Sequence, residues 1–234
     1  MFRLIKLKPP HGWNAVAWEL AIVTLGVLIA LGAQQVVQTI QWTSDVRETR
    51  KALDAELSRD LAAFDWRWNK RDCNEARLKE LDRWATSLAD GRPLALQKEI
   101  TGPRFFAIRN GVWRATSSDV TNHMPLDIKL NYAGMYDTMG TFDEILRDEA
   151  KAWTTLENYQ RDRQLSRPEL RELRGAIADL HDTADLLNVF RQRLDSAAAV
   201  LKIKPVPHID AGVADQLALN SRDFCRPLLA AGGR

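Results

Sequence analysis

Four histidines are the residues of this chain best suited to binding a metal, and their spacing predicts no metal site. They are His11, His123, His181 and His208. None belongs to a His-Glu-x-x-His or Glu-x-x-His pair, the spacings that bring zinc or di-iron ligands together on one helix face. His181-Asp182 is a dipeptide of some metal-dependent phosphohydrolases, but its partner histidines are missing. We interpret it as a pair on a helix surface and predict neither a metal nor a cofactor.

The other familiar catalytic patterns are missing too. Ser117 and Ser118 lie outside any Gly-x-Ser-x-Gly turn, and the sequence has no Walker A loop or dinucleotide glycine pattern. We therefore predict no catalytic residues.

A cluster of carboxylates could bind a cation. Its members are Asp143, Glu144, Asp148 and Glu149. Because Arg147 and Lys151 are interleaved with these acids, we favour a solvated, salt-bridged helix face over a cation site.

The chain has two cysteines, Cys73 and Cys225, and these could form a disulfide. In an oxidising compartment such a bond would tie the C-terminal tail to the first long helix of the domain. Two unrelated thiols are the alternative. An even count in an exported domain favours the bond.

Aromatic residues supply the remaining candidate site. Eight tryptophans are a high number for 234 residues. The aromatic side chains selected as a possible ligand pocket are Trp113, Tyr132, Tyr136 and Trp153. Packing in the core is the favoured alternative for the same residues.

Composition limits the partners. Lys and Arg number 33 and Asp and Glu 31, a formal net charge of +2. Nucleic-acid binding usually needs a strongly basic face, so this balance argues against it.

The N-terminal region predicts a membrane anchor. Residues 20–37 contain no charge, and extension back to Ala15 adds only Glu19. About 23 residues make a helix of ~34 Å, enough to cross a bilayer core of ~30 Å. Flanking tryptophans suit the headgroup layers. A cleaved signal peptide ending at Ala30-Leu31-Gly32 and a buried core helix are the alternatives to this uncleaved anchor.

Flanking charges predict the orientation. Three bases precede the span and three follow it, so the count alone nearly ties. Arg3, Lys6 and Lys8 lie near the free amino group, and long domains cross largely regardless of charge. We expect a cytoplasmic arm at 1–14, a transmembrane helix at 15–42, an extracytoplasmic bundle at 43–204 and a tail at 205–234.

The polar residues of this helix are Glu19, Gln34, Gln38 and Gln41. The three glutamines share one helix face and could bind a neighbouring helix through their amides. Alternatively, they mark where the helix leaves the lipid, with Glu19 at the opposite headgroup layer.

The anchor sequence, from Glu19 through Gly26-Val27-Leu28-Ile29-Ala30-Leu31, resembles an uncharacterised bacterial family of single-pass membrane proteins. Members carry an E-x(6)-G-[VI]-L-I-A-L type anchor followed by a charged helix. The resemblance covers about the first 60 residues. It implies a location in a bacterial inner membrane, so the extracytoplasmic bundle expected from the flanking charges would lie in the periplasm. The resemblance supplies no catalytic residue.

Apolar spacing predicts an all-α protein, with an antiparallel helical bundle after the anchor. Stripes at three- and four-residue intervals run over 53–68, 78–88 and 170–201. A short helix is expected over 112–121 and another over 211–219. A helical pattern begins at Leu126, and Thr141 and Glu144 predict a fresh helix from Phe142 to about 162. Ser166 and Glu169 predict a capping box before the last long helix. The anchor either runs directly into the bundle or restarts at Thr43-Ser44-Asp45.

Together these features favour a non-catalytic accessory protein that docks onto a larger membrane or periplasmic assembly. Its expected partners are the membrane and other membrane subunits or further copies of itself, and no nucleic acid. A sensor-like domain that binds a small ligand in an aromatic pocket is the alternative.

Overall fold

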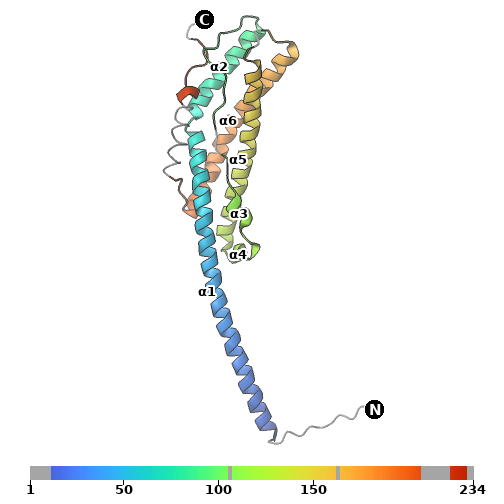
Figure 1. Cartoon of the computed structure of the whole chain (residues 1–234), viewed down its shortest axis with the longest axis vertical. Helices are drawn as coiled ribbons and strands as arrows, with labels where there is room; N and C mark the ends of the chain where they lie inside the picture. Colours follow the sequence, from blue (N-terminus) through green and yellow to red (C-terminus); the bar gives the residue numbers. More distant parts are fainter. Residues whose placement is uncertain (1–11, 105–106, 162–163, 207–221, 231–234) are drawn as a thin grey trace, which may run out of the picture. The chain divides into compact units, whose positions relative to one another are not determined.

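The computed structural model describes residues 12–104, 107–161, 164–206 and 222–230 (Figure 1). Within them the helices are α1 (Gly12–Trp68), α2 (Arg71–Ala89), α3 (Gly111–Ala115), α4 (Ser118–Asn122), α5 (Leu126–Tyr159) and α6 (Arg167–Leu201). In this part of the chain extended pairing is limited to one isolated bridge, between Leu96 and Leu229. The all-α fold class predicted from the sequence is confirmed.

The chain divides into two units, and the boundary lies within α1, between Thr49 and Arg50. The first unit contains one helical segment that is long and apolar enough to cross a membrane. Its most apolar 18-residue window has a mean hydropathy of 2.1, and none of that window is buried by the described residues. The helix has no restart at Thr43, whose hydroxyl donates to the Thr39 carbonyl at 2.8 Å as in a helix interior.

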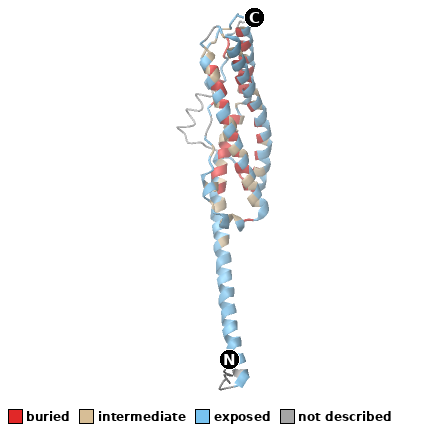
Figure 2. Cartoon of the chain, turned by 90° about the vertical axis from the view of Figure 1, so that its right-hand side faces the viewer, coloured by how far each residue is buried: buried red, intermediate tan, exposed pale blue. Residues whose placement is uncertain are grey.

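The second unit is a helical bundle formed by residues 50–68 of α1 with α2, α5 and α6. The helices α1 and α2 follow one another with only Asn69 and Lys70 between them, and α5 and α6 run side by side (Figure 1). In this unit the buried positions lie on the faces that the helices turn toward one another (Figure 2).

The first part of the core lies where α1 meets α5 and α6. The stripe predicted on α1 is buried, since Leu53, Leu57, Leu61 and Phe64 are each at most 5% exposed. Three rings join the three helices edge to face. Phe64 lies 5.1 Å from Phe142 of α5, and Phe142 lies 6.2 Å from Phe190 of α6, measured between ring centroids.

The second part of the core joins α2, α5, α6 and the C-terminal segment. Its largest members are completely or almost completely buried and include Leu78, Leu81, Trp84, Trp153, Leu156, Leu173, Ile177, Leu180, Phe224 and Leu228. Burying a large apolar side chain contributes roughly 1.5–3 kcal/mol, so these contacts supply much of the force that holds the helices together.

The predicted start of a helix at Phe142 is wrong, because α5 continues from Leu126 through Gly134 and Gly140. The Thr141 hydroxyl donates to the Asp137 carbonyl one turn earlier and so does not cap a new helix. Burial of Met135, Met139 and their neighbours outweighs the cost of a helical glycine, about 1 kcal/mol each.

The helix expected over 112–121 is two short helices instead. Thr116 is extended, with ψ of 125°, and ends α3. The Ser117 side chain then accepts from the Val120 N–H and begins α4.

The capping box at Ser166 and Glu169 is confirmed. At its other end α6 stops at Lys202, which has a left-handed φ of 60°. The helix expected over 211–219 lies outside the described residues.

Candidate functional site

The four aromatic residues selected from the sequence lie in two separate places. The Trp113 ring stacks on Tyr136, with centroids 5.1 Å apart, and Tyr132 lies one turn before Tyr136 on α5. Trp153 lies 17 residues further along the same helix, about 25 Å away at ~1.5 Å per residue. The four therefore cannot line one pocket.

Trp153 belongs to the second part of the core. It meets Phe224 edge to face, at a centroid distance of 6.0 Å. The backbone at Gly102 crosses its ring so closely that a Cβ there would lie 2.6 Å from the Trp153 ring carbons. Only glycine fits this crossing, and Trp153 is 3% exposed.

Two buried carboxylates of α1 lie beside the Trp113–Tyr136 stack. Glu56 is 5% exposed and Asp60 is 2% exposed. Glu56 accepts the Val112 N–H at 3.1 and 3.2 Å and the Tyr136 hydroxyl at 2.9 Å. Tyr132 likewise donates its hydroxyl to Asp54. We call Glu56, Asp60, Trp113, Tyr132 and Tyr136 the carboxylate–tyrosine cluster.

The Glu56 side chain, which belongs to α1, caps the N-terminus of α3. Val112 is the second residue of α3, and the side chain of the N-cap residue Asn110 makes no capping hydrogen bond. The first N–H groups of a helix have no partner within it, and a negative charge there is stabilised by the helix dipole. The carboxylate therefore fixes the start of α3, and through it the position of Trp113.

Asp60 is the least satisfied member of the cluster. Its Oδ1 accepts the Arg109 N–H at 3.1 Å, whereas the buried Oδ2 has no partner among the described residues. Burial raises the pKa of this carboxyl to about 7, and the neighbouring Glu56 carboxylate adds to the increase, while the Arg109 N–H opposes it. The cluster can therefore bind and release one proton near neutral pH.

The tyrosines of the cluster stay protonated. Burial and then the hydrogen bond to Asp54 raise the pKa of Tyr132 to about 12. Burial and the hydrogen bond to Glu56 raise the pKa of Tyr136 as well. Both hydroxyls are donors to carboxylates, which makes them structural partners and not proton acceptors.

Glu56 and Asp60 were not among the residues selected from the sequence. The signal that could have found them is their position, since they alternate with Leu53, Leu57 and Leu61 on the buried face of α1. Carboxylates are almost never fully buried unless they are paired, so acids within an apolar stripe indicate a buried polar contact.

The acidic residues of α5 separate into exposed and buried members. Arg147 pairs with Asp143, and Lys151 pairs with Asp148 at 2.7 Å, as on a salt-bridged face. Glu149 differs, because its Oε1 binds Arg67 Nη2 of α1 at 2.6 Å in an ion pair that is almost completely buried. In the described part of the chain no group of three or more His, Cys, Asp or Glu side chains could hold a metal ion.

The two histidines within the described residues have separate partners. His181 of α6 contacts Asp82 of α2 at 3.0 Å, and His123 contacts the Asp119 carbonyl at 2.7 Å. His11 and His208 lie outside the described residues. Glu19, Gln34, Gln38 and Gln41 are exposed on α1 in the first unit.

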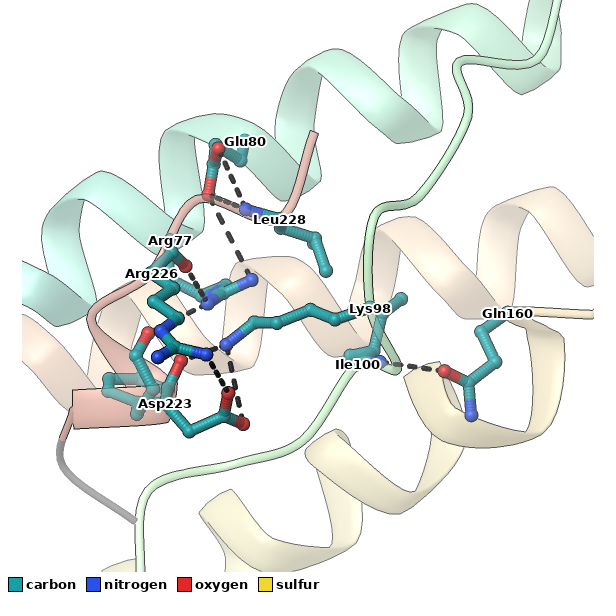
Figure 3. A network of polar contacts seen from close by, with 9 residues as sticks. Arg77, Glu80, Lys98, Ile100, Gln160, Asp223, Arg226 and Leu228 are labelled. Carbon is teal, nitrogen blue, oxygen red and sulfur yellow. Dashed lines mark hydrogen bonds and ion pairs between the residues drawn. The ribbon is translucent and has the colours of Figure 1, made fainter. Parts of the chain in front are cut away.

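A second polar network holds residues 222–230 against α2 (Figure 3). Arg77 Nη2 donates to the carbonyls of Phe224 and Arg226 at 2.7 and 2.8 Å. Glu80 accepts the Leu228 N–H at 3.0 and 3.1 Å. Lys98 donates to the Asp223 carbonyl, and its pKa is lowered, chiefly by burial. Residues 222–230 are thus attached to α2 and to the segment around Lys98.

The disulfide predicted between Cys73 and Cys225 is present in this network. It joins α2 to the C-terminal segment across a sequence separation of 152, with the Cα atoms 5.0 Å apart. Arg77, one turn after Cys73, also lies over the Phe224 ring at 5.5 Å. The covalent bond and the polar contacts therefore act on the same few residues.

Comparison with protein-family models, with curated proteins and with solved structures finds no match to this chain.

Replacing Asp60 with asparagine is expected to remove a pH dependence of stability. In the folded protein the carboxyl holds a proton up to about pH 7, whereas its ordinary pKa is 3.8. Between these values only the folded state holds the proton, so the free energy of unfolding falls as the pH rises, by up to ~1.4 kcal/mol per pH unit. Chemical denaturation followed by tryptophan fluorescence across this range measures the slope. The exposed Asp137→Asn control should keep the wild-type slope, and an unchanged slope in the Asp60 variant would contradict the assignment.

Breaking the disulfide is expected to lower the stability of the bundle. Closing a loop of this length restricts the unfolded chain, and loss of the bond should cost about 2–5 kcal/mol. Thermal unfolding of the wild type and of the C73S/C225S variant, each with and without reductant, tests this. Reductant should lower the Tm of the wild type and leave that of the variant unchanged. Quantitative alkylation of two thiols in wild-type protein isolated without reductant would contradict the pairing.

Proposed function

We propose that this chain is a membrane-anchored, non-catalytic interaction protein whose helical bundle docks onto a larger membrane or periplasmic assembly. The observation that supports this most directly is the apolar window of α1, of which the described residues bury none. A continuous apolar surface of this length needs a lipid or protein environment. An anchor that keeps a folded bundle at the membrane meets that need.

The expected location is a bacterial inner membrane, with the N-terminus in the cytoplasm and the bundle in the periplasm. Arg3, Lys6 and Lys8 before the span support this orientation. The disulfide supports it independently, because disulfides persist in oxidising compartments such as the periplasm. The bacterial assignment rests on the resemblance of the anchor.

The use of the polar side chains supports a binding role over a catalytic one. The Glu56 carboxylate and the hydroxyls of Tyr132 and Tyr136 are engaged in holding α3 and α5 to α1. A catalytic group needs access to a substrate, and these groups lie inside the bundle. The sensor alternative loses support for the same reason, and because Trp153 lies far from the other three aromatic residues.

Reporter fusions test the topology. Alkaline phosphatase fused after residue 234 should be active, because it folds only outside the cytoplasm, and a cytoplasmic reporter at the same point should be inactive. The intact N-terminus should be found by sequencing the membrane-bound protein. The reverse reporter pattern would refute the orientation, and an N-terminus near Ala33 would indicate a cleaved signal peptide.

We also expect the anchor helix to associate with a neighbouring helix through the face that carries Gln34, Gln38 and Gln41. In the Q34L/Q38L/Q41L variant the amides can no longer bind a neighbouring helix, each such bond being worth ~1 kcal/mol or less in a membrane. Cross-linking in mild detergent should therefore show weaker association, roughly tenfold or more, with membrane insertion unchanged. The V36L/I40L variant, altered at apolar positions on the opposite side of the helix, should associate like the wild type. If the glutamine variant also does so, the glutamines only mark the end of the lipid-embedded segment.

A further inference from the structure

We propose that the groove between α5 and α6 binds a basic amphipathic helix of a partner protein. This inference rests on the proposed function, since it names the chemistry of the docking partner. The groove is an open cavity of about 660 Å³ between the two longest helices of the bundle. Both helices lie in the second unit and pack along each other.

Part of the lining is made of small residues. Ala152 of α5 and Ala176 and Thr183 of α6 are buried, and Gly175 of α6 is exposed beside them. A Cβ added at Gly175 would meet nothing within 4 Å, so the space above this glycine is open. Small side chains let the backbone of a further helix approach closely, and the furrow between two packed helices suits the ridge of a third.

The walls of the groove are acidic. Four carboxylates line it, those of Asp148, Glu172, Asp179 and Asp182, against the single ammonium of Lys151. Lys151 is already bound to Asp148 at 2.7 Å. Asp179 and Asp182 have no ion-pair partner within the described residues. Such a concentration of negative charge, in a chain with a formal net charge of +2, is complementary to lysine or arginine side chains.

One end of the groove continues into exposed apolar residues. Leu186 lines this end and is 41% exposed, and Val189, one turn further along α6, is 44% exposed. An occupant therefore needs apolar side chains for this end and basic ones for the rest. The groove residues of α6 extend from Glu172 to Leu186, which corresponds to about 21 Å, or roughly four turns of helix.

A second copy of the same groove is a poor occupant, because its carboxylates would face those of the first. Like charges across an interface oppose binding. The occupant that fits is a partner helix of about four turns, with one basic and one apolar face.

Fluorescence anisotropy with the intact protein in mild detergent tests the proposal. The probe is a labelled helical peptide of about four turns, with lysines on one face and leucines on the other. A second peptide of the same composition has a scrambled order that destroys the two faces. The ordered peptide should bind at least tenfold more tightly than the scrambled one, and added salt should weaken its binding.

Two groove variants and one control distinguish the contribution of the groove's shape to peptide binding from that of its charge. D179N/D182N should weaken binding of the ordered peptide by roughly fivefold to tenfold. G175L places a bulky side chain in the open space at Gly175 and should abolish binding, while its far-ultraviolet circular dichroism and Tm stay at or above those of the wild type. D90N/D137N, which removes two exposed carboxylates elsewhere, should bind like the wild type.

Equal binding of both peptides, or unchanged binding by G175L, would overturn the groove as the site and leave only general attraction between opposite charges. Formation of groove-to-groove cross-links between copies would overturn the choice of occupant. Neither result touches the proposed function, which fails instead if the wild-type chain is not retained in the membrane or the reporter fusions reverse.

Discussion

The buried polar and charged groups of α1 are the constraint on which the rest of the bundle depends. Glu56, Asp60 and Arg67 lie on the face of α1 that also carries the leucines of the core. Arg67 is in a buried ion pair, and removing one partner of such a pair typically costs ~3–5 kcal/mol. The two buried carboxyl groups need hydrogen-bond partners from other elements for the same reason, since an unpaired buried polar group is destabilising. Glu56 accepts hydrogen bonds from the Val112 N–H at the start of α3 and from the Tyr136 hydroxyl of α5. Asp60 accepts the Arg109 N–H. Arg67 forms an ion pair with Glu149 of α5. Tyr136 and Glu149 together set the register of α5 against α1, which apolar contacts alone would leave less defined.

The two ends of the bundle are held by different means. Near Arg50 the carboxylate–tyrosine cluster joins α1, α3 and α5 through hydrogen bonds, and one of its carboxyls stays partly unsatisfied. Beyond Arg67 the packing of α2, α5 and α6 is apolar, and residues 222–230 are fixed by Arg77, Glu80 and the disulfide. The proton-sensitive group and the redox-sensitive bond therefore lie in different parts of the same unit.

The sequence predicted the features that depend on local spacing. Leu53, Leu57 and Leu61 are buried as their four-residue intervals required, and the Ser166–Glu169 box begins α6. The Cys73–Cys225 disulfide was also predicted, because the chain has only two cysteines, but other features decided by contacts distant in sequence were missed. A fresh helix was expected at Phe142, yet Met135, Met139 and Phe142 are buried on one helix and keep it continuous. Glu56 resembles any helical surface acid in the sequence alone, because its partners Val112 and Tyr136 are more than 50 residues away.

The bond between Cys73 and Cys225 also changes how the protein responds to a cut in its backbone. The segment between the two cysteines contains α2 beyond Cys73 and all of α3, α4, α5 and α6, whereas α1 precedes it. A protease that hydrolyses one peptide bond within this segment opens the chain but leaves its two fragments covalently joined. Release of α5 or α6 from the fragment that carries α1 then needs either a second cleavage or a reductant, in addition to loss of their packing against α1 and α2.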